Sequence, residues 1–442
     1  MASEHPLRSR WASLSLVAVW LFSTPGLAQV GTPDTARPAD APVQAPSVAG
    51  ALPAGPQGSA TEARPADGDP GPDAPAALEQ GRAEEPSTAG LSLDARPASA
   101  RQDLADDAPQ RPDFKPWAVP VAVVPGLLFH GLAPLVAGDT HTAKRLFALE
   151  GTGLGLIALG GVPIVLTGAS RRTIAPLYAV TLAGFSALGI SALANLYAVT
   201  SPAFDPGVAP PMLPPLELEL GYQHVNDTAF DYRHFVTVGA QARFESLRLL
   251  GTVRVDPAEG NTQVRLGGAW RLLGAPERSL VGTDGSALDV EAFGQFHRYP
   301  TEGFAMVSGE VGLRGRLAMS RISPALAGSF AEVSLGTSLE TYTYAGAVSD
   351  GNLHDQLLYT FGYGVWLGRG GGPFRGEAML YYDHRKDSFV GGLRSRGGGI
   401  VGAFGLRGRA LLTESWGVAA EVQAGGALVG RLSLIYALGG ER

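Results

Sequence analysis

The chain of 442 residues contains no cysteine. Disulfides, thiolate metal sites, a cysteine nucleophile and a lipid-modified cysteine anchor are therefore excluded. Charged residues are also scarce, at 17% compared with about 25% in ordinary water-soluble domains. The net charge is −7, and no region is basic enough to suggest binding to nucleic acid.

The first 28 residues have the three parts of a secretory signal peptide. Arg8 and Arg10 give a positive start, and Trp11 begins a short apolar run. Small residues before Gln29 offer a cleavage site. Because the apolar run is too short for a comfortable membrane span, we expect cleavage, with an uncleaved anchor as the alternative.

Residues 29–115 are rich in Ala, Pro and Asp and have no aromatic residue before Phe114. This segment holds 14 acidic and 7 basic residues, so it carries the whole net charge of −7. Such a composition cannot bury enough apolar surface to offset its ordering entropy, and we expect a disordered linker. A reach toward a cell-wall or periplasmic partner is the second interpretation, beside a plain spacer.

Residues 116–200 contain three uncharged stretches, which predict hydrophobic helical segments. The first is broken by prolines and reads as an irregular lead-in. The others predict a helical hairpin over 150–168 and 174–199. Small residues at four-residue spacing indicate the face for close helix packing on the second helix, at Ala179, Ala183, Ala187 and Ser191. The first helix has Gly151, Gly155 and Leu159 in a similar register.

From residue 215 onward, apolar residues alternate with charged or small ones, so the period changes to two. In a strand this spacing places one set of side chains on each face. Segments of about ten residues with this alternation are typical of transmembrane β-barrels. About twelve such strands are predicted, near 215–224, 232–243, 246–255, 262–272, 287–298, 304–318, 328–344, 355–367, 374–384, 397–410, 416–425 and 428–438.

Charges of both signs are confined to one face of these strands, which favours a wet lumen over a lipid-facing surface. Aromatic residues near the strand ends fit the girdles of a membrane barrel, and a soluble sandwich is the alternative. Eight Glu and nine Arg form the inner set, and their near balance favours pairing that closes the lumen over an ion-selective pore. The expected lumen-lining residues are Glu217, Glu219, Glu291, Glu310, Glu332, Glu340, Glu377, Glu421, Arg248, Arg254, Arg265, Arg271, Arg314, Arg316, Arg407, Arg409 and Arg431.

The region 215–442 resembles the bacterial outer-membrane β-barrel proteins. Two local runs, Pro125 to Thr140 and Tyr381 to Asp387, resemble an uncharacterised Gram-negative family of such barrels. The resemblance implies a cell outer-membrane location, lipid around the barrel and insertion by the barrel assembly machinery. It brings no assigned activity with it. The chain departs from the usual pattern at its end, because its last aromatic residue is Tyr436 rather than the terminal residue.

The connector 201–214 is rich in proline and reaches only about 50 Å when fully extended. That length is too short to join two membranes across a periplasm. We therefore expect the hairpin and the barrel to share the outer membrane, with the hairpin beside or beneath the barrel. An even number of strands and a periplasmic N-terminus place both barrel ends in the periplasm and the loop 385–396 outside.

Two groups of residues contain side chains that could bind a metal or catalyse a reaction, although neither group matches a standard motif. His130, Asp139 and His141 suggest a metal site, and Asp383, His384 and Ser388 suggest an outer-membrane lipid hydrolase. Solvated or capping side chains explain the same residues, so we predict no catalytic, metal or cofactor residues.

The sequence thus predicts a non-enzymatic outer-membrane barrel with an envelope-structural or passive pore role. The alternatives are an inner-membrane-anchored periplasmic β-domain that binds a partner and, third, the lipid hydrolase.

Overall fold

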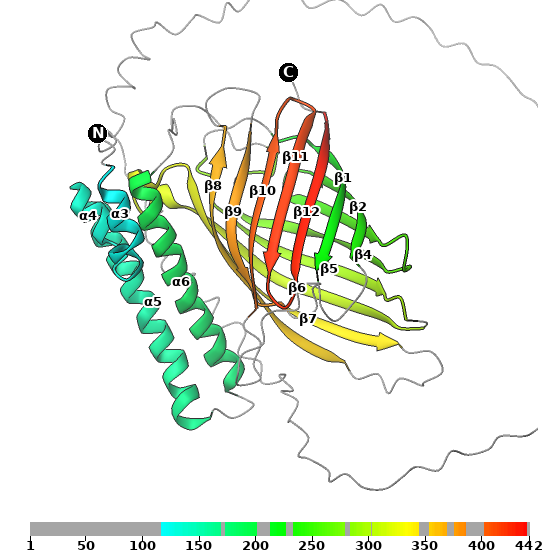
Figure 1. Cartoon of the computed structure of the whole chain (residues 1–442), viewed down its shortest axis with the longest axis horizontal. Coiled ribbons are helices and arrows are strands. Elements are labelled where there is room, and N and C mark those ends of the chain that lie inside the picture. Colours follow the sequence, from blue (N-terminus) through cyan, green and yellow to red (C-terminus); the bar gives the residue numbers. More distant parts are fainter. Residues whose placement is uncertain are drawn as a thin grey trace, which may run out of the picture. The chain divides into compact units, whose positions relative to one another are not determined.

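The computed structural model describes residues 116–168, 173–200, 213–226, 233–278, 283–301, 303–343, 353–368, 375–385 and 402–439. The predicted signal peptide, the whole of the predicted linker 29–115 and most of the connector 201–214 lie outside the described residues. The described residues form a set of helices followed by a β-barrel (Figure 1).

Twelve strands close into one barrel in which every strand is antiparallel to its neighbours and β1 pairs with β12. The predicted membrane all-β fold with about twelve strands is confirmed, and a soluble sandwich is excluded. The strands are β1 Leu216–Asn226, β2 His234–Arg243, β3 Leu247–Val255, β4 Thr262–Gly274, β5 Ala287–Arg298, β6 Ala305–Ala318, β7 Ser329–Thr343, β8 His354–Leu367, β9 Arg375–Asp383, β10 Ala403–Leu411, β11 Trp416–Ala424 and β12 Leu428–Leu438.

The strand alternation turns apolar side chains to the outside of the barrel. On β1, Leu218 and Leu220 are exposed, whereas the neighbouring Glu217 points to the other face of the strand and is only 3% exposed. Leu406 and Leu432 repeat this outward exposure on β10 and β12. A closed barrel that turns a band of large apolar side chains outward and its charged side chains inward has the lipid-facing surface of a membrane barrel.

The helices precede the barrel in the chain. They are α3 Ala118–Val123, the 3-10 helix η2 Pro125–Leu127, α4 Leu132–Ala137, α5 Thr140–Thr167 and α6 Ile174–Thr200. Two further 3-10 helices, η3 Met319–Arg321 and η4 Pro324–Leu326, lie in the turn between β6 and β7. The predicted lead-in is therefore partly helical rather than irregular.

Helix α5 begins ten residues before the predicted start at 150. Gly138 ends α4 with φ of 94°, and the side chain of Asp139 caps α5 by accepting a hydrogen bond from the Thr142 N–H at 2.9 Å. Lys144 and Arg145 do not break the helix because both are exposed. The helix also continues past Pro163.

The faces along which α5 and α6 pack differ from the predicted ones. A Cβ atom at Gly184 would lie 2.7 Å from the carbonyl oxygen of Gly153, so these two glycines form the close contact. At Gly151 and Gly155 the same Cβ would meet nothing within 4 Å. Small residues recur on more than one face of α5, so their spacing alone did not identify the face that packs against α6.

The run Pro125 to Thr140 folds the short helices onto the hairpin. The backbone N–H of His130 donates to Glu150 Oε2 at 3.0 Å, and the His130 ring is hydrogen-bonded to Ser191 on α6. Gly131 allows a close approach, since a Cβ there would lie 2.5 Å from the carbonyl oxygen of Ala143. These contacts give the run a structural role.

Candidate functional site

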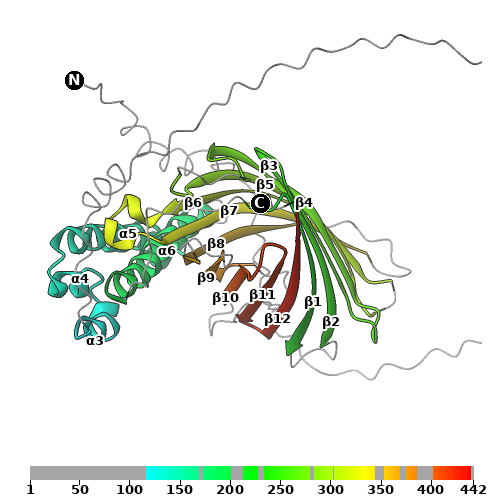
Figure 2. The same ribbon diagram turned by 90° about the horizontal axis from the view of Figure 1, so that it is seen from above.

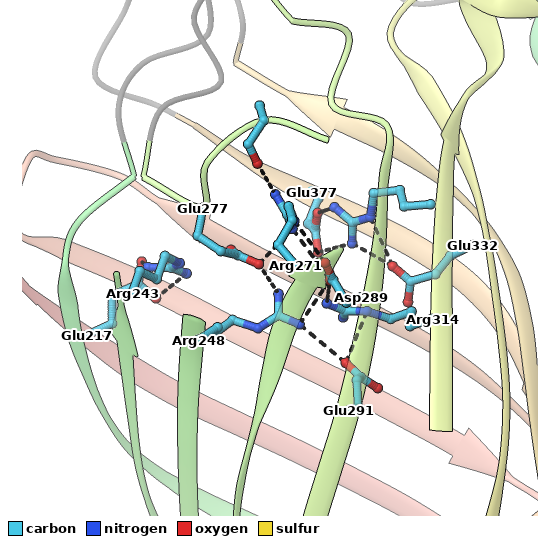
Figure 3. A network of polar contacts seen from close by, with 12 residues as sticks. Glu217, Arg243, Arg248, Arg271, Glu277, Asp289, Glu291, Arg314, Glu332 and Glu377 are labelled. Atoms are coloured by element: carbon cyan, nitrogen blue, oxygen red, sulfur yellow. Dashed lines mark hydrogen bonds and ion pairs between the residues drawn. The ribbon is translucent and has the colours of Figure 1, made fainter. Parts of the chain in front are cut away.

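The candidate site is the charged interior of the barrel, where arginines and carboxylates form ion pairs between strands that are not neighbours (Figure 3). Ion pairs of this kind join β6 to β9 and β7 to β10. Side chains three strands apart reach one another through the inside of a barrel, so these residues lie in its interior. The groups come from the strand faces opposite to the outward leucines.

The first cluster centres on Asp289, a β5 carboxylate that is 2% exposed. Its Oδ1 accepts from Arg271 Nε at 2.8 Å and its Oδ2 accepts from Arg314 Nη2 at 2.8 Å. Glu277 approaches Arg271 at 2.7 Å, and Glu291 approaches Arg314 at 3.1 Å. Each arginine therefore has two acidic partners, which holds β4, β5 and β6 together from the inside.

Arg248 on β3 extends this first cluster. Its guanidinium lies 3.4 Å from Glu277, 3.8 Å from Asp289 and 3.3 Å from Glu291. Figure 3 shows the acidic groups around it on several sides. Glu277 was not predicted because it follows β4 in a turn, where the period-two pattern carries no information.

The second cluster joins β6 and β7 to β9 and β10, strands that are not neighbours in the barrel. Glu332 on β7 contacts Arg316 at 2.7 Å and Arg407 at 2.9 Å. Arg316 also contacts Glu377 on β9 at 2.7 Å. The guanidinium of Arg316 lies over the ring of Phe330, 4.3 Å from its centre. This chain of alternating charges runs through the barrel interior from β6 and β7 to β9 and β10.

A third cluster surrounds Glu217 at the start of β1. Arg243 on β2 lies 2.8 Å from its carboxylate, and Arg409 on β10 also pairs with it. Arg409 in addition lies 3.7 Å from Glu219. Arg243 was not among the predicted residues, although its position at the end of β2 follows the same alternation.

The fourth cluster joins β4, β6 and the residues that follow β9. Glu310 on β6 pairs with Arg265 at 2.8 Å and with Arg385 at 2.7 Å. Arg385 comes just after β9, so strand periodicity again gave no signal for it. Glu421 and Arg431 pair between the adjacent strands β11 and β12 at 3.0 Å.

Two predicted lumen residues form hydrogen bonds with uncharged side chains. Arg254 donates to Gln263 Oε1 at 2.7 Å. Glu340 accepts a hydrogen bond from the hydroxyl of Tyr342 at 3.0 Å.

Solvent reaches part of this interior. The side chains of Arg407, Arg265 and Glu377 are 40%, 34% and 31% exposed, whereas those of Asp289 and Glu217 are 3% exposed. Ion pairs therefore join strands through the barrel interior, and solvent reaches some of the charged side chains there.

The alternative chemical clusters have other contacts. Asp139 caps α5, His141 is exposed, and the His130 ring faces Ser191 and the carbonyl oxygen of Leu127. Within the described parts of the chain, no group of three His, Cys, Asp or Glu side chains is placed to hold a metal ion.

The residues considered for hydrolysis also have structural contacts. His384 Nδ1 is hydrogen-bonded to the Tyr382 hydroxyl at 2.9 Å, and Asp383 Oδ1 accepts from the backbone N–H of Arg385 at 3.1 Å. Ser388 lies outside the described residues. The geometry thus supplies no arrangement of Asp383 and His384 around a nucleophile among the described residues.

The sequence matches no protein-family model and no curated protein. Its fold is similar to solved outer-membrane structures: the KdgM porin (10% identity, 50% of this chain and 99% of that chain, TM-score 0.30) and Omp33 of Acinetobacter baumannii (10%, 51% and 98%, 0.26). The β domain of the Bordetella autotransporter BrkA is also similar, with 13% identity over 50% of this chain and 97% of that chain and a TM-score of 0.27. The class of the protein follows from the barrel itself: a closed antiparallel barrel with an apolar outer band is an outer-membrane β-barrel protein.

Proposed function

We propose that the protein is a passive, non-enzymatic pore of the outer membrane with a narrow lumen for small hydrophilic solutes. The observation that carries this proposal is the solvent exposure of Arg407 and Glu377 inside a closed barrel. A water-filled lumen lined by charges is the arrangement through which outer-membrane barrels conduct.

The ion pairs set the expected selectivity. Because nearly every arginine named above is matched by a carboxylate, the passage has little net charge and should discriminate weakly between anions and cations. The chain Glu377–Arg316–Glu332–Arg407 crosses the passage and should limit its conductance.

The test is single-channel recording of the purified full-length protein in planar lipid bilayers. We expect small, discrete conductance steps and larger steps in Glu332→Gln, since that change weakens the contacts of Arg316 and Arg407 across the lumen. Glu259→Gln is the matched control, because Glu259 is exposed in the turn between β3 and β4. Its steps should equal those of the unmodified protein.

An envelope-structural barrel is the second candidate, favoured by the number of ion pairs that join strands inside the barrel. Protein that migrates on gels as a heat-modifiable, folded barrel but gives no conductance would overturn the pore and support this role. Insertion by the barrel assembly machinery and a periplasmic partner for residues 29–115 stay predictions.

A further inference from the structure

Helix α6 packs against the outside of the barrel, on the face formed by β7 and β8 (Figures 1 and 2). Leu182 and Ile190 of α6 are buried in apolar clusters that include Tyr359 and Tyr363 of β8. A Cβ atom at Gly189 would lie 3.0 Å from the ring of Phe361, so the helix approaches the strand closely. This part of the barrel wall is covered by the hairpin.

Polar contacts accompany this packing. The hydroxyls of Ser186 and Tyr359 are hydrogen-bonded at 2.6 Å, and both residues are buried. Tyr359 occupies an outward position of β8, in the same alternation that turns leucines to the outside on other strands. A hydroxyl at that depth needs a partner in an apolar solvent, and α6 provides it.

The hairpin is attached to both ends of the barrel. Near one end, the Tyr197 hydroxyl donates to the carbonyl oxygen of Ala327 at 2.7 Å, in the turn between β6 and β7. Thr142 at the start of α5 meets Ser323 of the same turn, with their hydroxyl oxygens 2.5 Å apart. At the other end, the ring centre of Tyr178 lies 5.1 Å from that of His384, just after β9.

These contacts give the hairpin the same height as the lipid-facing wall. The path from Tyr178 to Tyr197 along α6 is 19 residues, or about 28 Å at 1.5 Å per residue. The apolar band of an outer-membrane barrel is about 25 Å tall. A helix that contacts both rims of such a wall crosses the whole apolar layer.

The side of α5 away from the barrel is apolar and exposed. Leu154, Leu159 and Val165 are 54%, 65% and 82% exposed. Both α5 and α6 are long and apolar enough to cross a membrane. The exposed side of the hairpin and the outward face of the barrel both carry large apolar side chains, so the same apolar solvent would suit both surfaces.

We propose that α5 and α6 cross the outer membrane beside the barrel and that the exposed side of α5 contacts lipid acyl chains. The membrane-embedded unit is then the barrel together with two helices docked on β7 and β8. This inference does not depend on whether the lumen conducts.

The absence of cysteine makes a direct test possible, because single cysteines introduced into the full-length protein are the only reactive thiols. Leu154→Cys and Phe185→Cys report on the exposed sides of α5 and α6. Leu406→Cys on β10 is the lipid-facing reference, and Glu259→Cys in the turn between β3 and β4 is the water-facing one. Each variant is spin-labelled and reconstituted in phosphatidylcholine and phosphatidylglycerol vesicles, and collisions with oxygen and with a water-soluble nickel complex are measured.

We expect Leu154→Cys and Phe185→Cys to match Leu406→Cys, with high oxygen and low nickel accessibility. If they match Glu259→Cys instead, in protein whose heat-dependent gel shift shows a folded barrel, the hairpin lies outside the membrane and the proposal is wrong. A second readout uses outer-membrane fractions, where a membrane-impermeant maleimide should modify Glu259→Cys but not Leu154→Cys. Equal modification of the two would also contradict the proposal.

Discussion

The substitution Asp289→Asn tests whether the ion pairs inside the barrel stabilise it. The carboxylate is 2% exposed and accepts from Arg271 and Arg314, each at 2.8 Å. Removing one partner of a buried ion pair typically costs about 3–5 kcal/mol. Arg271 keeps Glu277 at 2.7 Å and Arg314 keeps Glu291 at 3.1 Å, so we expect the lower end, about 3 kcal/mol.

A loss of about 3 kcal/mol lowers the ratio of folded to unfolded protein by roughly a hundredfold, since each 1.4 kcal/mol is about tenfold. The assay is reversible urea unfolding in phospholipid vesicles, followed by tryptophan fluorescence. Glu259→Gln is the control, because it removes an exposed carboxylate and should change the free energy of unfolding by less than about 0.5 kcal/mol. A cost below about 1 kcal/mol for Asp289→Asn would refute the reasoning, and would mean that water in the lumen already screens these charges.

Two further predictions concern the hairpin and an exposed ion pair. Gly184→Leu should destabilise the packing of α5 on α6 by about 1–3 kcal/mol or more, because the new side chain would meet the α5 backbone. Gly155→Leu is the control, because it faces open space and should be nearly neutral. Thermal unfolding followed by circular dichroism measures both. Burial opposes ionisation of Asp284, but hydrogen bonds from Arg321 and from a backbone N–H outweigh it and lower the pKa of this carboxyl. Asp284→Asn should therefore lower the free energy of unfolding by up to about 1 kcal/mol at pH 7. This loss should shrink as the pH falls below about 4 and through the lowered pKa of Asp284, because the carboxylate is then protonated in the unmodified protein as well. A stability difference between the two proteins that persists in acid would contradict this prediction.

Much of the barrel was predictable because a strand with one lipid-facing side must alternate with a period of two. Leu218, Leu220 and Glu219 show this within one strand, and turns between strands interrupt it. The pattern also identified charged residues that share a strand face, such as Glu332 and Arg316. It carries no information on which of them meet across the lumen.

Residues outside the strands were missed for the same reason. Glu277 and Arg385 lie in connections, where no periodicity applies, yet both reach into the charged interior. The start of α5 was misplaced because charged residues near it were taken as a break. Lys144 and Arg145 face outward, and Glu150 accepts a hydrogen bond from the His130 N–H, so the helix accommodates all three. The contact of Gly153 with Gly184 was missed because a repeat of small residues specifies a face of a helix but not its partner.

The docking of α6 on β8 has a consequence for the order of folding. Ser186 and Tyr359 meet across 173 positions of the chain. The hairpin is synthesised before any strand, yet its binding surface exists only after β7 and β8 have paired. Closing so long a loop is slow and unfavourable until the late contacts form. The hairpin must therefore be shielded from other apolar surfaces during transit, and its docking belongs to the last stages of assembly.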